Sequence, residues 1–214
     1  MIRKLAVAVA ALILLYLGYL GWRVVEERAA VSGKVDAIIA RADPDELALP
    51  PHRIAALIRI EDPTFWSNKG IDLSTPGAGM TTLSQGLGKH LFFDDFEPGF
   101  RKGELMALTR FALYPKVDKD RTLKAAIANA YLGTSRRQAV TGFADGARTW
   151  FNKLLSQLSD REFLELEAML VAPDMLKPGR GDAERIERVK RIERLLAGQC
   201  HPIGLRDVML DGCA

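Results

Sequence analysis

The sequence places one acidic pair at the end of an apolar segment. Glu61 and Asp62 directly follow RIAALIRI, and Pro63 then prevents a helix from continuing. A carboxylate at the end of an apolar helix, beside a loop rich in glycine and proline, is a candidate for a partly desolvated acid or base. Carboxylates at helix ends are also common structural features, so the pair alone does not define a site.

A second segment, MTTLSQGLGKHLFF at 80–93, separates polar from apolar side chains if it is helical. Gly86 and Gly88 lie in its interior, where glycine costs about 1 kcal/mol relative to alanine, so they favour close approach by a ligand. The alternative is a polar stripe that faces solvent. The residues expected to bind a ligand here are Thr81, Thr82, Gln85 and Lys89.

A third segment, FRKGELMALTRFAL at 100–113, begins an apolar helical run. Glu104 follows Arg101 and Lys102, and a carboxylate beside two cations normally stays ionised. Together the three side chains could form a mixed site for a phosphate-bearing group. The alternative is an ordinary helix N-terminus, where the helix dipole favours the charge of Glu104.

Several other kinds of chemistry are excluded by the residues that are missing. The three histidines, at 52, 90 and 201, lie far apart and lack the HExxH spacing of zinc proteases. The sequence has no GxSxG, and Leu83 stands where a Walker A motif needs its first glycine. A net charge of +3 over 214 residues is too small to favour nucleic acid as a partner. Serine-based hydrolysis, nucleotide hydrolysis and a protein-bound metal are therefore not predicted.

Helical periodicity dominates the chain, so the predicted fold is mostly α. The segment 181–197 is predicted to be an amphipathic helix with a solvated charged face. The loops 62–79 and 92–100 flank the candidate residues and are expected to carry function. The predicted helices cover 33–42, 52–61, 80–92, 101–113, 119–132, 142–153, 159–171 and 181–197.

The N-terminus predicts a membrane anchor. Residues 5–22 carry no charge and, extended to 25, nearly span a hydrocarbon core of roughly 30 Å. Arg3 and Lys4 precede this segment and keep a cytoplasmic tail, 1–4, inside by the positive-inside rule. The alternative is a cleaved signal peptide, which usually has a shorter apolar region. Residues 26–51 are predicted to form a linker and a first helix outside the cytoplasm.

The chain has two cysteines, both in the predicted C-terminal tail, 198–214. In an oxidising compartment Cys200 and Cys213 are expected to form a disulfide, which would stabilise the fold by about 3 kcal/mol in the chain-entropy model. The alternative is two buried thiols in a frayed tail. No motif around either cysteine indicates catalysis.

Five segments, in order, resemble those of peptidoglycan glycosyltransferases. EDPTFWSNKG at 61–70 resembles the family's EDxxFxxHxG, and GMTTLSQGLGKHL at 79–91 resembles GxSTITQQLxKNL. FRKGE at 100–104 matches RKxxE loosely, and two later stretches, 142–153 and 158–178, also resemble family segments. This family comprises the transglycosylase module of class A penicillin-binding proteins and the monofunctional peptidoglycan transglycosylases.

The resemblance implies a lysozyme-like, bilobed glycosyltransferase domain at 52–197 behind a single N-terminal transmembrane helix. Such a domain polymerises lipid-linked disaccharide-pentapeptide (lipid II) into glycan strands, with inversion and release of polyprenyl diphosphate. The implied partners are this precursor, the growing glycan chain, the membrane and other cell-wall synthesis proteins. The implied location is the bacterial cytoplasmic (inner) membrane, with the N-terminus inside and the catalytic domain on the periplasmic face.

The resemblance also assigns roles to residues. Glu61 is the implied general base, and Glu104 is the implied second catalytic carboxylate. No cofactor is required, although a divalent metal, Mg²⁺ or Mn²⁺, at the diphosphate is an alternative to direct assistance by Glu104. The implied substrate-binding residues are Asp62, Phe65, Thr81, Thr82, Gln85, Lys89, Arg101 and Lys102.

Two other functions stay open at this point. Asn68 and Gly86 replace a histidine and a glutamine of the family motifs, which favours a catalytically weak relative that binds lipid-linked precursor or acts as a scaffold in cell-wall synthesis. A lytic transglycosylase or muramidase is the other alternative. Its chemistry needs no cation, so Lys89 argues against it.

Overall fold

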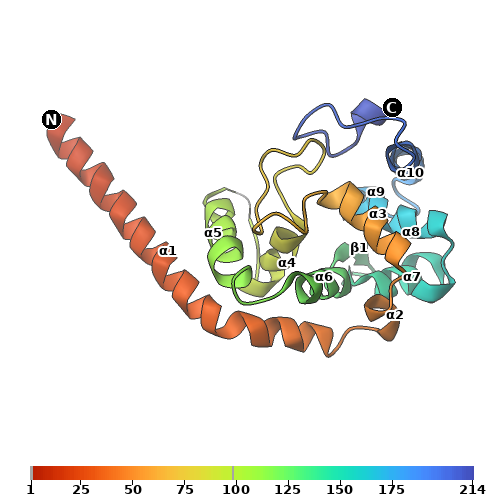
Figure 1. Cartoon of the computed structure of the whole chain (residues 1–214), viewed down its shortest axis with the longest axis horizontal. Coiled ribbons are helices and arrows are strands. Elements are labelled where there is room, and N and C mark those ends of the chain that lie inside the picture. The colour runs from red at the N-terminus through yellow and green to blue at the C-terminus, as the bar shows by residue number, and fades with distance from the viewer. Residues whose placement is uncertain (1, 98) are drawn as a thin grey trace.

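The computed structural model describes residues 2–97 and 99–214, most of which are helical, as the sequence predicts (Figure 1). A long N-terminal helix projects away from the other elements, which pack together (Figure 1). A π-helical turn, Thr109–Leu113, extends α5, and short 3₁₀ turns occur at Leu155–Gln157 and Asp211–Cys213. The helices are α1 (Ile2–Ile39), α2 (Pro44–Leu47), α3 (Pro51–Glu61), α4 (Leu83–Phe92), α5 (Phe100–Leu108), α6 (Lys119–Ala128), α7 (Phe143–Phe151), α8 (Asp160–Met169), α9 (Pro173–Leu176) and α10 (Asp182–Leu196).

The two ends of helix α1 lie in different surroundings. Its apolar N-terminal part is exposed to the surroundings and is long and apolar enough to cross a membrane. Its C-terminal part is amphipathic instead, and Val31 and Val35 are completely buried against the domain. The helix continues without interruption to Ile39, so the linker predicted after residue 25 is wrong.

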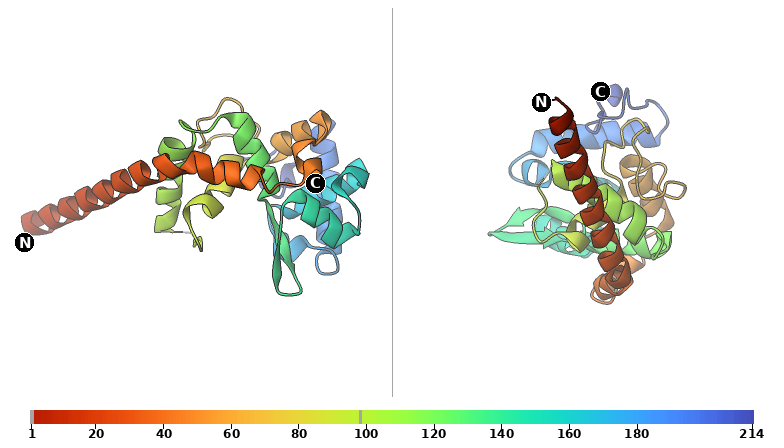
Figure 2. Two further views of the ribbon diagram at one scale, coloured as in Figure 1. Left: turned by 90° about the horizontal axis from the view of Figure 1, so that it is seen from below. Right: turned by 90° about the vertical axis from the view of Figure 1, so that its left-hand side faces the viewer.

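Two hydrophobic cores divide the domain into two lobes. The left-hand view of Figure 2 shows the helices of the two lobes beside each other. The small core joins the end of α1 to α4, α5 and the π-helical turn, through residues such as Leu91 and Leu105. The large core joins α3, α7, α8, α9 and α10. Helix α6 contributes Ala125 to the small core and Ile127 to the large core, so it ties the two lobes together.

A β-hairpin interrupts the helical pattern where the sequence predicts a helix to residue 132. Helix α6 ends at Ala128, and β1 (Tyr131–Ser135) pairs antiparallel with β2 (Gln138–Thr141). Two arginines, Arg136 and Arg137, form the turn with positive φ angles of 48° and 67°. Asparagine and glycine usually mark such turns, so this sequence carries no recognisable hairpin signal.

Helix α4 begins at Leu83 rather than at residue 80, because Thr82 caps it. The Thr82 hydroxyl accepts a hydrogen bond from the backbone N–H of Gln85 at 3.1 Å and donates one to the carbonyl of Gly70 at 2.8 Å. The Gln85 side chain accepts in return from the backbone N–H of Thr82, which completes a capping box. Residues 80–82 are therefore free to line a cavity instead of continuing the helix.

We predict that Thr82→Ala lowers the free energy of unfolding by about 0.5–2 kcal/mol, because it removes the helix cap. Thr82→Ser is the matched control, since it keeps the hydroxyl and should stay close to wild type. Chemical denaturation of the three full-length proteins in one detergent, followed by circular dichroism, measures the difference. Equal losses in both variants would contradict a capping role.

Candidate active site

A cavity of about 1000 Å³ is lined by residues that belong to both lobes. Glu61 lines it at the end of α3, and Lys89 lines it from α4. The loop 77–82 forms another part of its wall, and Arg188 and Val208 approach from the C-terminal part of the chain. The cavity thus brings a carboxylate and cations from distant sequence segments to one space.

Glu61 is paired with a buried arginine. Its Oε1 lies 3.5 Å from Nη2 of Arg188, whose side chain is only 2% exposed. Arg188 also donates from Nε to the carbonyl of Ala168 at 3.2 Å. The carboxylate of Glu61 and the carbonyl of Ala168 together hold the guanidinium of Arg188 in place. Glu61 therefore faces a fixed positive charge at the edge of the cavity.

The sequence analysis missed Arg188, because it assigned the charges of α10 to a solvated face. The buried face of α10 in fact follows steps of three and four residues, through Arg185, Arg188, Val189 and Ile192. A stripe of apolar residues at steps of three alone, beginning at Ile186, would rotate gradually around the helix, and Ile186 is 39% exposed. The spacing of Arg188 relative to Val189 and Ile192 was the signal that could have identified it.

A second carboxylate, Glu167 of α8, lies close to Glu61 and was also missed. Its side chain is completely buried, and neither oxygen has a hydrogen-bond partner among the residues that the structure describes. Burial, reinforced by the negative charge of Glu61, raises the pKa of Glu167 well above its ordinary value. Burial thus favours the neutral form of the Glu167 carboxyl group, which lies close to the Glu61–Arg188 pair.

Two lysines lie on the side of the small lobe: Lys89 lines the cavity, and Lys102 is hydrogen-bonded to the lining residues Met80 and Thr81. Lys102 of α5 donates from Nζ to the carbonyl of Met80 at 2.5 Å and to Thr81 Oγ1 at 3.0 Å. Burial and the nearby charge of Lys89 lower the pKa of Lys102 to about 8, and burial lowers the pKa of Lys89. Two like charges held close together in a partly buried place indicate an anion site.

The other polar residues of 80–93 divide into two groups. Thr81 lines the cavity beside Lys102. Gln85 is completely buried, and its oxygen accepts from Lys102 at 3.2 Å, so it positions a cation rather than lining the cavity. Thr82 lines the cavity, but its hydroxyl is engaged in the α4 cap. His90, which was not predicted, also lines the cavity.

Asp62 and Phe65 were predicted to bind substrate, but the structure places both in the interior. Asp62 is completely buried and accepts hydrogen bonds from the backbone N–H of Leu83 at 3.1 Å and from Asn68 Nδ2 at 2.7 Å. Phe65 is completely buried in the large core, with Lys119 Nζ 4.4 Å from its ring centre. Both residues join the end of α3 to its neighbours, and neither lines the cavity.

Arg101 lies at the outside of the site. It donates to the carbonyl of Asp95, and its guanidinium lies 5.8 Å from the ring centre of Phe93. Both Asp95 and Phe93 line the cavity, whereas Arg101 is exposed. The predicted cation pair of 101 and 102 is therefore split, with Lys102 at the cavity and Arg101 at its rim.

Glu104 faces away from the cavity, contrary to its predicted place as a second catalytic carboxylate. Its Oε1 accepts hydrogen bonds from Tyr19 and from Arg23 Nε, both at 3.0 Å. Residues two apart on a helix point about 200° apart, so Lys102 and Glu104 lie on opposite sides of α5. Because Lys102 points toward Met80 and Thr81 in the wall of the cavity, Glu104 faces α1.

A metal at the site has no recognisable set of ligands. Among the described residues, no three Asp, Glu, His or Cys side chains come together in a way that could hold an ion. The negative charge of a ligand would instead meet Lys89 and Lys102.

The helical fold and the cavity, lined by a carboxylate and by cations, are compatible with a glycosyl-transferring enzyme, and comparison with known proteins gives the family. The model of the transglycosylase family matches residues 40–197, so the chain belongs to this family. It is 30% identical over 165 residues to the biosynthetic peptidoglycan transglycosylase of Rhodospirillum centenum, covering 70% of this chain and 68% of that protein. It is 27% identical over 181 residues to penicillin-binding protein 1B of Haemophilus influenzae.

The two kinds of relative differ in how much of them the chain represents. The match to the Haemophilus protein covers 76% of this chain but 23% of that protein. The match to penicillin-binding protein 1B of Escherichia coli, at 28% identity, covers 70% of this chain and 19% of that protein. The chain thus spans about a quarter or less of these penicillin-binding proteins, and its similarity to them concerns the transglycosylase part.

We predict that Asp62 makes the fold less stable as the pH rises from about 4 to about 6. Burial raises the pKa of Asp62 from its ordinary value near 3.8 to about 6. The folded protein therefore binds this proton more tightly than the unfolded chain, and ionisation in this window removes up to ~3 kcal/mol of stability. Asp62→Asn should lack this component. Denaturation of both proteins at several pH values tests it, and equal pH slopes would contradict it.

We predict that Glu104→Gln keeps glycosyltransferase turnover within about threefold of wild type, because a catalytic carboxylate would lose ~100-fold or more. Glutamine can still accept from Tyr19 and Arg23. Glu104→Leu removes the acceptor and should lower the melting temperature. Turnover assays and thermal melts of the same preparations separate the two effects, and an inactive but stable glutamine variant would restore Glu104 to catalysis.

Proposed function

We propose that this protein polymerises lipid-linked disaccharide-pentapeptide into glycan strands, with inversion at the anomeric carbon. The observation that carries the proposal is the cavity, lined by Glu61 from one lobe and Lys89 from the other, with Lys102 bonded to its wall at Thr81, in a member of the transglycosylase family. The name of the Rhodospirillum relative, a biosynthetic peptidoglycan transglycosylase, supports synthesis rather than cleavage of glycan.

Glu61 acts as the general base in this proposal. The attacking group is a sugar 4-hydroxyl, which is a poor nucleophile until its proton is removed. Glu61 accepts that proton while the oxygen forms a bond to the anomeric carbon of the donor. Arg188 fixes the direction of the carboxylate, because it is held in turn by the carbonyl of Ala168.

The leaving group is a lipid diphosphate, and its bond to the anomeric carbon breaks as the new bond forms. Negative charge then accumulates on the diphosphate, where fixed cations stabilise it. Lys89 and Lys102 provide them, and Lys102 is already oriented by Met80, Thr81 and Gln85. Attack from the side opposite the diphosphate inverts the anomeric centre without a covalent intermediate on the enzyme.

The anchor fits a reaction between two lipid-linked molecules. Donor and acceptor both carry lipid tails in this proposal, so the cavity must work at a bilayer surface. Helix α1 has the length and hydropathy of a membrane span. We infer a single-pass protein of the inner membrane, with Arg3 and Lys4 inside and the domain on the periplasmic face.

A catalytically weak relative is the second candidate. Glu104, the implied second carboxylate, faces α1 and is paired with Arg23, which leaves Glu61 as the one glutamate lining the cavity within the described part of the chain. A protein of this kind would bind the lipid-linked precursor without extending it. It could then act with other cell-wall synthesis proteins.

We predict that Glu61→Gln abolishes chain growth, with a loss of about 10²–10⁴-fold if Glu61 is the general base. Glutamine keeps the size of the side chain and its hydrogen bond from Arg188 but accepts no proton. The assay incubates detergent-solubilised full-length protein with labelled lipid-linked precursor and separates the glycan chains on a gel. A variant rate within about threefold of wild type is incompatible with this role.

Preformed glycan serves as a second substrate in the same experiment. Shortening of this glycan by wild type, with no use of lipid-linked precursor, would identify a lytic enzyme. Binding of the precursor by both proteins, with polymerisation by neither, would identify a weak relative. A folded, precursor-binding Glu61→Gln protein shows that its inactivity does not come from unfolding.

A further inference from the structure

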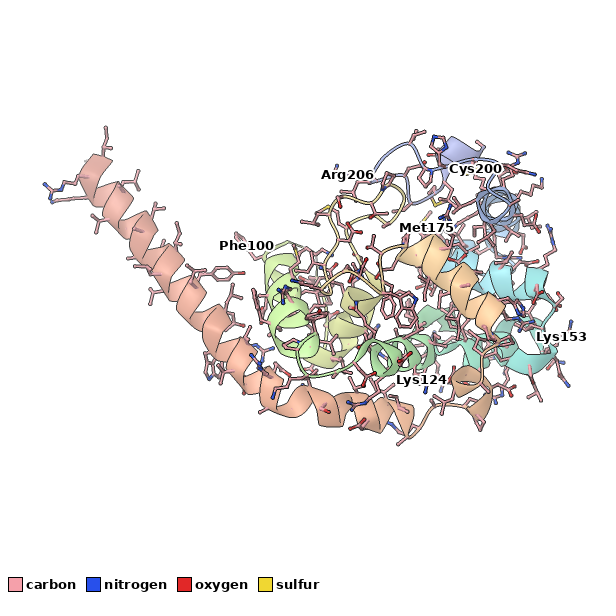
Figure 3. The ribbon with its side chains drawn as sticks, viewed as in Figure 1. Phe100, Lys124, Lys153, Met175, Cys200 and Arg206 are labelled. Atoms are coloured by element: carbon pink, nitrogen blue, oxygen red, sulfur yellow. A yellow bond between two sulfur atoms is a disulfide. The ribbon has the colours of Figure 1, made fainter. Side chains whose placement is uncertain are left out.

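The chain forms an ordered loop after α10, in the region that follows the part matched by the family model. A disulfide joins Cys200 to Cys213 with a Cα–Cα distance of 5.3 Å, and these residues close what we call the C-terminal loop, 200–213. Inside the loop, Asp207 accepts backbone hydrogen bonds from Ile203 at 3.0 Å and from Gly212 at 3.0 Å. Figure 3 labels Cys200 beside α10 and Arg206 farther along the loop.

The first contact of the C-terminal loop is with the wall of the cavity. The backbone N–H of Gly77 donates to the carbonyl of Gly204, and that of Gly79 donates to the carbonyl of Leu205, both at 2.9 Å. These segments also run side by side in Figure 1. Gly77 and Gly79 line the cavity, so the loop supports the cavity wall from outside.

Glycine is required for this close approach. Gly77 and Gly79 have φ angles of 81° and 66°, which side chains other than glycine rarely adopt. A Cβ atom on Gly79 would lie 2.7 Å from Cγ1 of Val208, and one on Gly77 would lie 2.5 Å from Cγ of Pro202. Val208 itself lines the cavity, so the C-terminal loop is part of the wall as well as its support.

The second contact of the C-terminal loop is with Arg188, the residue that forms an ion pair with Glu61. Arg188 donates from Nη1 to the carbonyl of Val208, from Nε to the carbonyl of Ala168, and from Nη2 to Glu61. The C-terminal loop and α8 therefore hold the guanidinium from two sides. A loop that moved away would release one of these two fixed points and leave Arg188 able to turn.

We propose that the disulfide-closed C-terminal loop is a positioning element of the active site, which holds the wall at Gly77 and Gly79 and keeps Arg188 directed at Glu61. Apart from one short 3₁₀ turn the loop has no regular structure, so the cross-link limits the conformations that compete with these contacts. The catalytic part of the inference rests on the proposed function, whereas the loop contacts do not.

The experiment compares wild type with Cys200→Ser/Cys213→Ser, both full length and in detergent. Hydrogen exchange of the Gly77 and Gly79 amides reports the wall, and kcat and KM for lipid-linked precursor report the site. In the double variant both amides should exchange faster, KM should rise, and kcat should fall. The expected loss in kcat/KM is about tenfold or more, because displacement of a catalytic group by about 1 Å can cost ~100-fold.

Reduction provides an independent route to the same state. The chain has two cysteines, so dithiothreitol, which becomes oxidised as it converts the disulfide to two thiols, acts on one bond only. Reductant should bring wild type to the level of the double variant and leave the double variant unchanged. Reoxidation should restore wild-type turnover, which loss of folded protein through aggregation would not allow.

Two further variants keep the test decisive if the double variant does not fold. Asp207→Asn weakens the loop with the disulfide intact and should raise exchange at Gly77 and Gly79 in the same way. Ile203→Ala is the matched control, since this side chain is 78% exposed on the same loop and should change neither exchange nor kinetics. Thermal melts confirm that each protein is folded at the assay temperature.

The outcomes separate this inference from the proposed function. Unchanged exchange at Gly77 and Gly79 after loss of the disulfide and in Asp207→Asn overturns the inference, whatever the activity. A lower kcat with unchanged KM, in proportion to the loss of folded protein, also overturns it, because the disulfide would then only stabilise the fold. Faster exchange in a protein whose wild type does not polymerise precursor overturns the proposed function and leaves the wall contacts established.

Discussion

The end of α4 depends on cations supplied by α1. The last carbonyls of a helix have no partner within the helix, and in α4 Arg23 donates to that of Phe92 at 3.2 Å and Lys34 to that of Leu91 at 2.9 Å. Glu27 lies between the two cations, 3.2 Å from Arg23 and 2.8 Å from Lys34. A membrane-type helix is thus joined through buried charge to the helix that carries Lys89.

This junction also explains the orientation of α5. Glu104 forms an ion pair with Arg23, which directs the Glu104 side of α5 toward α1. Lys102 lies on the opposite side of α5 and is therefore directed toward the wall of the cavity. The same interaction therefore fixes the anchor to the small lobe and directs Lys102 toward the wall of the cavity. A carboxylate that the motif resemblance assigns to catalysis here joins the anchor to the domain.

The sequence predicted the position of each segment better than the direction of each side chain. Glu61 and Lys89 were found because a carboxylate at a helix end and a lysine on a glycine-rich helix stand out in the sequence, and both line the cavity. The burial of Asp62 could not be predicted, because the sequence around it does not reveal the backbone N–H of Leu83, 21 residues away, from which it accepts a hydrogen bond. Arg188 was missed because a buried arginine is recognised by its partners, which come from three distant segments.

Glu61, Arg188 and Glu167 form one cluster of interacting ionisable groups at the cavity. Arg188 carries one positive charge between two glutamates, and two ionised carboxylates there would share it. Burial and the charge of Glu61 raise the pKa of Glu167, which favours its neutral form and leaves less negative charge to compete with Glu61 for Arg188. The guanidinium can then be directed at Glu61, and the C-terminal loop supplies the backbone carbonyl that keeps it there. A buried acid with a raised pKa, a fixed cation and a loop outside the family match together orient Glu61, the one glutamate that lines the cavity among the described residues.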